Sequence, residues 1–147
     1  MEQKSTRHKG KHLLVIEDEE MVGDILKIIL EEAGYAVTLV STGVEGLKSF
    51  RLNEPAIDLV ITDQVMPGMS GFDVAMECKK IRAEVPVIMC SGSYPFNFPD
   101  YNALGIDAYV MKPFTFELLV RTVGRVLDEK DRLADLAANV EFGRSVN

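Results

Sequence analysis

Short apolar runs alternate with longer amphipathic stretches along most of this chain. The expected strands cover residues 13–16, 36–40, 57–63, 85–90 and 108–111. Most of these runs are rich in Val, Ile and Leu without strict alternation of polar residues, which is typical of strands buried on both faces of a parallel sheet. The pattern therefore predicts an α/β fold in which a parallel sheet carries helices on both faces through right-handed crossovers.

Helical periodicity follows the first three strands and the last one. The expected helices cover residues 21–32, 41–54, 71–82 and a long stretch from about residue 115. The first helix has one apolar stripe, made of Val22, Ile25, Leu26 and Ile29. The second is expected to turn three side chains inward, those of Val44, Leu47 and Phe50. The third carries the apolar residues Phe72, Ala75, Met76 and Ile81. Gly34 is expected to end the first helix as a left-handed cap, and Thr42 with Glu45 has the spacing of a capping box.

Three segments depart from the repeating pattern. Residues 94–99 contain two prolines, so we expect the fourth helix to be short or irregular, with at most one turn in 99–104. Residues 1–11 are polar and without periodicity, which predicts a flexible leader before a folded domain at 12–127. Residues 128–147 are expected to extend the last helix and then fray.

Composition excludes several classes of function. The chain has 147 residues, enough for one domain, and a net charge of −7, which argues against direct binding of nucleic acid or an anionic membrane surface. It has no apolar run of membrane-spanning length and no signal peptide. Cys78 and Cys90 lack the spacing of a metal or redox motif. A cytoplasmic location is expected.

Polar side chains follow the buried strands at their carboxyl ends, the edge at which open α/β sheets bind ligands. They are Glu17, Asp18, Asp63, Ser91 and Lys112. Crowded carboxylates need a cation, and an oxygen-only donor set favours Mg²⁺ (or Mn²⁺), with the Val65 carbonyl as a further ligand. Lys112 and Ser91 could hold phosphoryl oxygens, which leaves Asp63 as the acceptor of a phosphoryl group.

Each of these residues also has a simpler interpretation. Asp63 could cap the next helix, Lys112 could be a solvated surface lysine, and Ser91 could make a local turn bond. Tyr109, in the last strand, could be a core residue. Glu19 and Glu20 are best explained as acids that complement a helix dipole.

The ordered set of motifs resembles the receiver domain of two-component response regulators over about residues 11–127. The resemblance rests on four segments: Leu13-Leu14-Val15-Ile16-Glu17-Asp18-Glu19, Asp63-Gln64-Val65-Met66-Pro67-Gly68-Met69-Ser70-Gly71, Val87-Ile88-Met89-Cys90-Ser91-Gly92 and Tyr109-Val110-Met111-Lys112-Pro113. It implies a flavodoxin-like, doubly wound, five-stranded sheet of order 2-1-3-4-5.

The resemblance also implies a chemistry. Asp63 would accept a phosphoryl group from the phosphohistidine of a sensor histidine kinase or a histidine phosphotransfer protein. Glu17, Asp18 and Asp63 would hold the metal, although Glu17 stands where the family more often has aspartate. Ser91 and Lys112 would contact the phosphoryl oxygens, the Lys112–Pro113 bond would be cis, and Ser91 with Tyr109 would form a conformational switch.

Three other functions compete with a phosphoacceptor receiver. An aspartate-nucleophile phosphatase of the haloacid dehalogenase type needs a second acid at position 65, which is Val65 here. A dinucleotide or flavin module needs a glycine-rich phosphate loop, which is missing. A degenerate receiver would bind a protein partner without being phosphorylated. We therefore expect a signalling receiver that catalyses only its own phosphorylation and dephosphorylation, with no external substrate.

Overall fold

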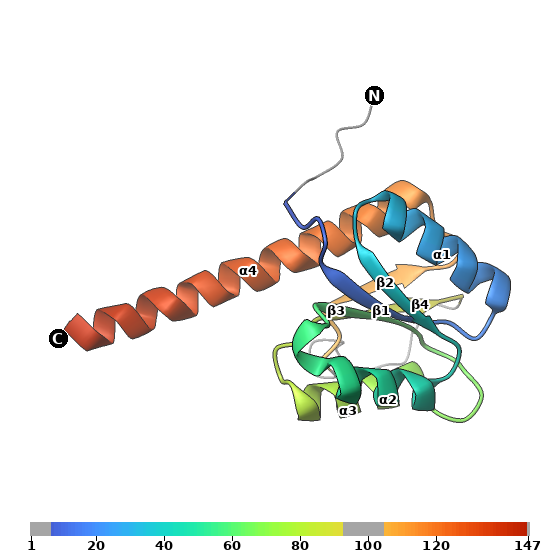
Figure 1. Cartoon of the computed structure of the whole chain (residues 1–147), viewed down its shortest axis with the longest axis horizontal. Coiled ribbons are helices and arrows are strands. Elements are labelled where there is room, and N and C mark those ends of the chain that lie inside the picture. Colours follow the sequence, from blue (N-terminus) through green and yellow to red (C-terminus); the bar gives the residue numbers. More distant parts are fainter. Residues whose placement is uncertain (1–6, 93–104, 147) are drawn as a thin grey trace.

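The computed structural model describes residues 7–92 and 105–146, with the side chains of residue 54 and residues 141–146 left out of the description. Five parallel strands form one sheet of order β2-β1-β3-β4-β5, which confirms the expected topology (Figure 1). The strands are β1 (His12–Ile16), β2 (Ala36–Val40), β3 (Leu59–Asp63), β4 (Val87–Ser91) and β5 (Ala108–Met111). Strands β3 and β4 each begin two residues later than the sequence pattern suggested.

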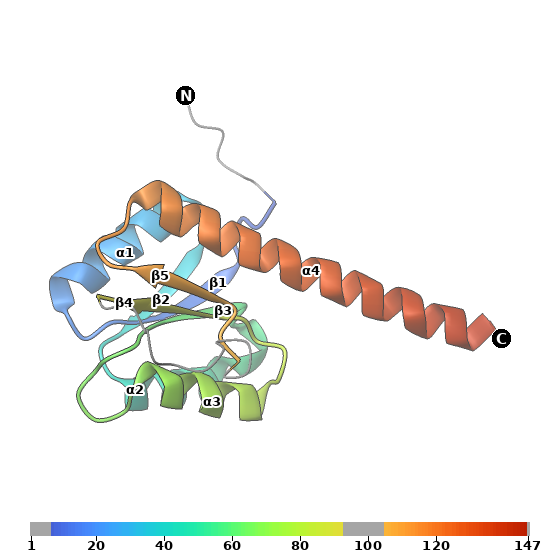
Figure 2. The same cartoon turned by 180° about the vertical axis from the view of Figure 1, so that it is seen from behind.

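Helices cover both faces of this sheet. They are α1 (Glu20–Glu32), α2 (Gly43–Asn53), the short 3₁₀ helix η1 (Glu54–Ala56), α3 (Gly71–Ile81) and α4 (Phe116–Val146). Helices α1 and α4 lie on one face and α2 and α3 on the other (Figures 1 and 2). Among the described helices, even the 31-residue α4 lacks the apolar stretch that crossing a membrane requires.

Alternate strand residues supply two separate cores, because successive side chains of a strand point to opposite faces. Leu13 and Val15 pack in the core beneath α1 and α4. Leu14 and Ile16 pack in the second core, beneath α2 and α3. Strand β1 lies inside the sheet between β2 and β3, so all four side chains are almost completely buried.

Some of the apolar helix residues that the sequence pattern singled out are exposed. Val44 is 68% exposed, and Ile25 and Met76 are each 48% exposed. The prediction for α2 holds for Leu47 and Phe50, which are buried, and is wrong for Val44, because a glycine faces the sheet instead. A Cβ atom on Gly46 would lie 2.2 Å from Cδ1 of Ile16, so α2 packs directly on β1 through this position. Counting apolar side chains alone cannot find such a contact.

Both ends of the described chain differ from expectation. The prediction of a flexible leader is wrong for residues 7–11, which form a turn in which Gly10 N–H donates to Gly34 O at 2.8 Å. His8 is only 3% exposed and lies 2.7 Å (Nε2) from Asp128 Oδ1. At the other end α4 continues to Val146, so the helical extension is present, and the fraying of its end stays a prediction. The expected irregular segment at 94–99 and turn at 99–104 lie outside the described residues.

Candidate functional site at the carboxyl edge of the sheet

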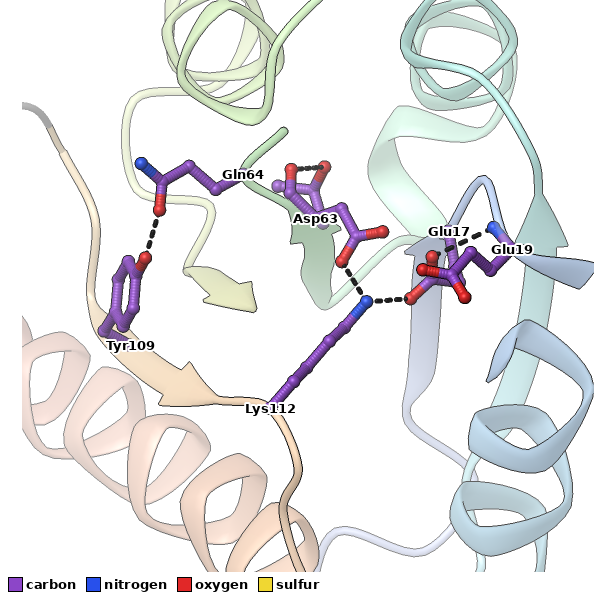
Figure 3. A network of polar contacts seen from close by, with 7 residues as sticks. Glu17, Glu19, Asp63, Gln64, Tyr109 and Lys112 are labelled. Atoms are coloured by element: carbon purple, nitrogen blue, oxygen red, sulfur yellow. Dashed lines mark hydrogen bonds and ion pairs between the residues drawn. The ribbon is translucent and has the colours of Figure 1, made fainter. Parts of the chain in front are cut away.

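Three strand ends bring an acid, a second acid and a lysine into contact. Glu17 follows β1, Asp63 ends β3 and Lys112 follows β5. The Lys112 Nζ atom lies 2.6 Å from Glu17 Oε1 and 2.7 Å from Asp63 Oδ1, so one ammonium group bridges two carboxylates (Figure 3). Both acidic residues are nearly buried, with exposed fractions for the whole residue of 3% for Glu17 and 5% for Asp63. The contact connects residues that the sequence separates by as much as 95 positions.

Backbone hydrogen bonds just beyond the strand ends fix these side chains. Glu17 N–H donates to Val40 O at 3.1 Å, and Lys112 N–H donates to Ser91 O at 2.7 Å. The Glu17 side chain is held in addition, because its Oε2 accepts the Glu19 N–H at 3.1 Å. The carboxylate and ammonium groups are therefore positioned by hydrogen bonds of the sheet itself, before any ligand binds.

A glycine packed against the backbone closes the loop that follows Asp63. Gly71 N–H donates to Gln64 O at 2.9 Å, and a Cβ atom at position 71 would lie 2.0 Å from Asp63 O. No other residue fits here without moving the end of β3. Helix α3 begins at the same point, with Ser70 and Asp73 forming a reciprocal capping box. The start of α3 and the position of Asp63 are thus linked.

The pKa values of the two buried acids are shifted in opposite directions. Burial, and then the hydrogen bond with Glu17, raise the pKa of Asp63 to about 8. Burial opposes ionisation of Glu17 as well, but hydrogen bonds with Asp63 and Lys112 outweigh it and lower the Glu17 pKa. The pKa of Lys112 is raised: burial acts against its charge, and the two carboxylates overcome that effect. In the metal-free cluster these shifts favour the protonated form of Asp63 and the ionised form of Glu17.

The donor set fits a hard divalent cation. One ligand oxygen from each of Glu17, Asp18 and Asp63 lies within 4.8 Å of the other two. Asp18 is exposed while the other two are buried, so the cluster opens to solvent on one side. Carboxylate oxygens with an open side suit Mg²⁺, which retains several waters when bound. Val65 lies in the loop after β3 with its side chain 73% exposed, and its carbonyl remains a predicted ligand.

The remaining predicted residues lie along the same edge. Ser91 is the last residue of β4 and is 5% exposed. Tyr109 lies in β5, and its hydroxyl donates to Gln64 Oε1 (Figure 3). The Lys112–Pro113 peptide bond is cis, as the resemblance implied. Sequence reasoning missed Gln64. Its one signal was a long polar side chain directly after the last residue of a buried strand.

Comparison with known proteins identifies the family. Residues 13–124 match the model of the response regulator receiver domain. The chain is 35% identical over 118 residues to the uncharacterized transcriptional regulatory protein YkoG of Bacillus subtilis, covering 79% of this chain and 50% of that protein. The protein therefore belongs to the response regulator receiver domain family. The chain spans about half the length of the curated relatives it matches.

Solved structures agree with this assignment. A response regulator receiver domain protein from Clostridium thermocellum superposes with a TM-score of 0.74 at 35% identity, covering 83% of this chain and 98% of that one. The response regulator TrrA of Thermotoga maritima, solved in complex with Mg²⁺–BeF, gives a TM-score of 0.71 at 34% identity, covering 79% of this chain and 98% of that one. Both resemble this chain across nearly their whole length.

Proposed function

We infer that this receiver is a phosphoacceptor, in which Asp63 takes a phosphoryl group from a phosphohistidine and the modified domain signals to a partner protein. The observation that carries this inference is the contact of Lys112 with Asp63 inside a cluster of three carboxylates. A buried nucleophilic carboxylate beside a fixed ammonium group and a cation-binding set is what phosphoryl transfer to an aspartate requires.

The transfer step is a displacement at phosphorus. An Asp63 carboxylate oxygen forms a bond to phosphorus while the bond from phosphorus to the donor's imidazole nitrogen breaks. The electron pair goes to that nitrogen, and a donor ring protonated on its other nitrogen leaves as neutral imidazole. Asp63 must be ionised to attack, and burial together with the hydrogen bond to Glu17 raises its pKa to about 8, so conditions that favour its carboxylate form should favour the transfer.

Glu17, Asp18 and Asp63 are the residues that would hold Mg²⁺. The bound ion would supply positive charge both for the carboxylates and for the phosphoryl oxygens. Lys112 then no longer has to neutralise Glu17, and its ammonium group, already 2.7 Å from Asp63, can pair with an oxygen of the incoming group. The structure of TrrA with Mg²⁺–BeF supports the choice of metal.

Ser91 and Tyr109 are the residues through which we expect the modification to be sensed. Ser91 lies on the strand next to Asp63, and Tyr109 lies one strand further along the sheet. A phosphoryl group on Asp63 would bias the arrangement of these side chains by the contacts it makes in one of two states. The partners proposed are a sensor histidine kinase or a histidine phosphotransfer protein upstream and a protein target downstream.

Labelling with a small phosphodonor tests the proposal. Phosphoramidate contains the phosphorus–nitrogen bond of phosphohistidine, so incubation with Mg²⁺ should add one phosphoryl group to the intact mass of the protein. The group should be labile to base, and EDTA should prevent its addition. Asp63→Asn should remain unmodified, whereas the exposed control Asp24→Asn should be modified like the wild type. Equal modification of wild type and Asp63→Asn would refute the assignment.

A further inference from the structure

Gln64 connects the acceptor segment to β5 at a second point. Its neighbour Asp63 contacts Lys112, while the Gln64 side chain points the other way and accepts the Tyr109 hydroxyl (Figure 3). Residues 63 and 64 thus make two contacts with the segment 109–112, one through each side of the chain. A movement of residues 63 and 64 would therefore change both contacts.

The backbone of Gln64 is hydrogen-bonded as well as its side chain. Gln64 N–H donates to Cys90 O of β4 at 2.8 Å, and Gln64 O accepts Gly71 N–H at the start of α3. The residue is only 6% exposed. Its amide oxygen is therefore a fixed acceptor rather than a mobile surface group, and its position depends on both β4 and α3.

Tyr109 is partly buried against the core beneath α2 and α3. Its ring therefore already occupies a packed position in the unmodified protein, with the hydroxyl satisfied by Gln64. Nothing in this arrangement requires a phosphoryl group. The hydrogen bond to Gln64 stabilises this packed position, because it satisfies a hydroxyl in a partly buried place.

We propose that Gln64 is a positioning residue that holds the Tyr109 ring in its packed position before phosphorylation, and so sets the resting state of this receiver. The amide oxygen of Gln64 contributes one hydrogen bond to the packed state and none when the ring turns to solvent. One such bond changes the ratio of packed to solvent-facing rings about fivefold. The role of Gln64 in signalling rests on the proposed function of Asp63, whereas its effect on the unmodified ring does not.

Fluorine NMR of protein containing 3-fluorotyrosine separates the effect of Gln64 on the unmodified Tyr109 ring from its role in signalling. The Tyr109 resonance is assigned by its loss in Tyr109→Phe. Gln64→Met keeps the length of the side chain without a strong acceptor, and Gln64→Glu keeps an oxygen acceptor. In the unphosphorylated protein, Gln64→Met should move the Tyr109 resonance toward the position of exposed fluorotyrosine, and Gln64→Glu should restore it. An unchanged resonance in Gln64→Met would overturn the proposal.

The phosphodonor is added in the second arm. Wild type should show a small change at Tyr109 on addition of phosphoramidate and Mg²⁺, and Gln64→Met a larger one, because more rings start in the solvent-facing state. Intact mass confirms modification in each sample. An equally large change in wild type and Gln64→Met would overturn the signalling role. If no variant is modified, the proposed function fails, and the first arm still decides whether Gln64 positions the ring. Should Gln64→Met not fold, Gln64→Leu replaces it.

Discussion

Lys112 Nζ lies 2.7 Å from Asp63 Oδ1 and at nearly the same distance from Glu17, so a single ammonium group holds two buried carboxylates together. The side chain of Lys112 is 21% exposed, while those of Glu17 and Asp63 are 1% and 7% exposed. In the metal-free protein this lysine supplies the positive charge that a divalent cation would otherwise provide. Its role in stability and its role in phosphoryl transfer should therefore separate when Mg²⁺ is added.

Lys112→Ala should destabilise the metal-free protein more than the Mg²⁺-bound one. Removing one partner of a buried ion pair costs about 3 kcal/mol, because the remaining charge is left without compensation. The loss should be larger in mildly alkaline than in mildly acidic buffer, since a protonated Asp63 needs no counter-charge. Thermal and urea unfolding with and without Mg²⁺ measure this. The exposed control Lys48→Ala should resemble wild type. Equal destabilisation with and without Mg²⁺ would contradict the account.

Binding of Mg²⁺ should release a proton near neutral pH. Because the pKa of Asp63 is raised to about 8, the metal-free fold favours the protonated acid, and ionisation reduces stability as pH rises from the ordinary value of 3.8 toward 8. Metal binding requires the carboxylate, so the apparent Mg²⁺ affinity should rise with pH through this window and level off above it. Calorimetry in two buffers with different ionisation enthalpies measures the released proton. A pH-independent affinity would contradict the raised pKa.

The raised pKa of Asp63 also predicts how Asp63→Asn changes thermal stability. Without metal, this variant should unfold at a higher temperature than wild type in buffer near or above pH 8, because it removes a buried carboxylate that is costly to ionise. With Mg²⁺ the order should reverse, since the variant lacks one ligand. Thermal unfolding across pH, with and without the ion, checks both statements. A variant less stable than wild type under all of these conditions would argue that Asp63 is ionised in the metal-free fold.

Gly71→Ala should disturb the site more than its size suggests. The added methyl group would meet the Asp63 carbonyl oxygen at 2.0 Å, so the loop or the end of β3 has to move. We expect a loss of about 2 kcal/mol in unfolding free energy, as for other overpacked positions, together with weaker Mg²⁺ binding. Gly124→Ala is the matched control, because nothing lies within 4 Å of a Cβ atom there and the residue is helical. That control should be neutral or slightly stabilising.

His8→Ala should release the turn that precedes β1. The imidazole Nε2 lies 2.7 Å from Asp128 Oδ1, and loss of this bond should lower the unfolding free energy by about 1 to 2 kcal/mol. Hydrogen exchange should accelerate at the Gly10 and Lys11 amides, which donate to Gly34 O and His8 O. Arg132→Ala, which breaks an exposed pair with Glu129 on the same helix, should leave these amides unchanged. Unaltered exchange at Gly10 in His8→Ala would show that the turn does not depend on the histidine.

The parallel sheet and the converging acids could be predicted because they depend on chain-wide regularities, whereas the strand order followed from the resemblance to receiver domains. Apolar runs separated by helical stretches specify a parallel sheet, and the rule that ligands meet its carboxyl edge brings Glu17, Asp63 and Lys112 together. The contacts that escaped prediction involve single residues without periodicity. His8 packs against Asp128 across 120 positions, and Gln64 receives a hydroxyl from Tyr109.

Helix faces were less predictable than strands for a related reason. In α2 the buried positions include Gly43 and Gly46 besides Leu47 and Phe50, so the apolar Val44 lies beside the buried stripe rather than within it. A glycine that allows close approach has no hydrophobic signature. The raised pKa of Asp63 was equally hidden, because it depends on burial and on the contact with Glu17, neither of which a sequence states.

Chemical trapping of the acyl phosphate tests most directly whether Asp63 is the residue that accepts the phosphoryl group. Protein treated with phosphoramidate and Mg²⁺ is reduced with borohydride, which converts a phosphorylated aspartate to homoserine, and its peptides are sequenced by mass spectrometry. The account predicts homoserine at position 63 and unchanged aspartate at positions 18 and 58. Homoserine at another aspartate, the longer alcohol that reduction of a phosphorylated glutamate gives, or no homoserine at position 63 in protein that carries the phosphoryl group, would contradict it.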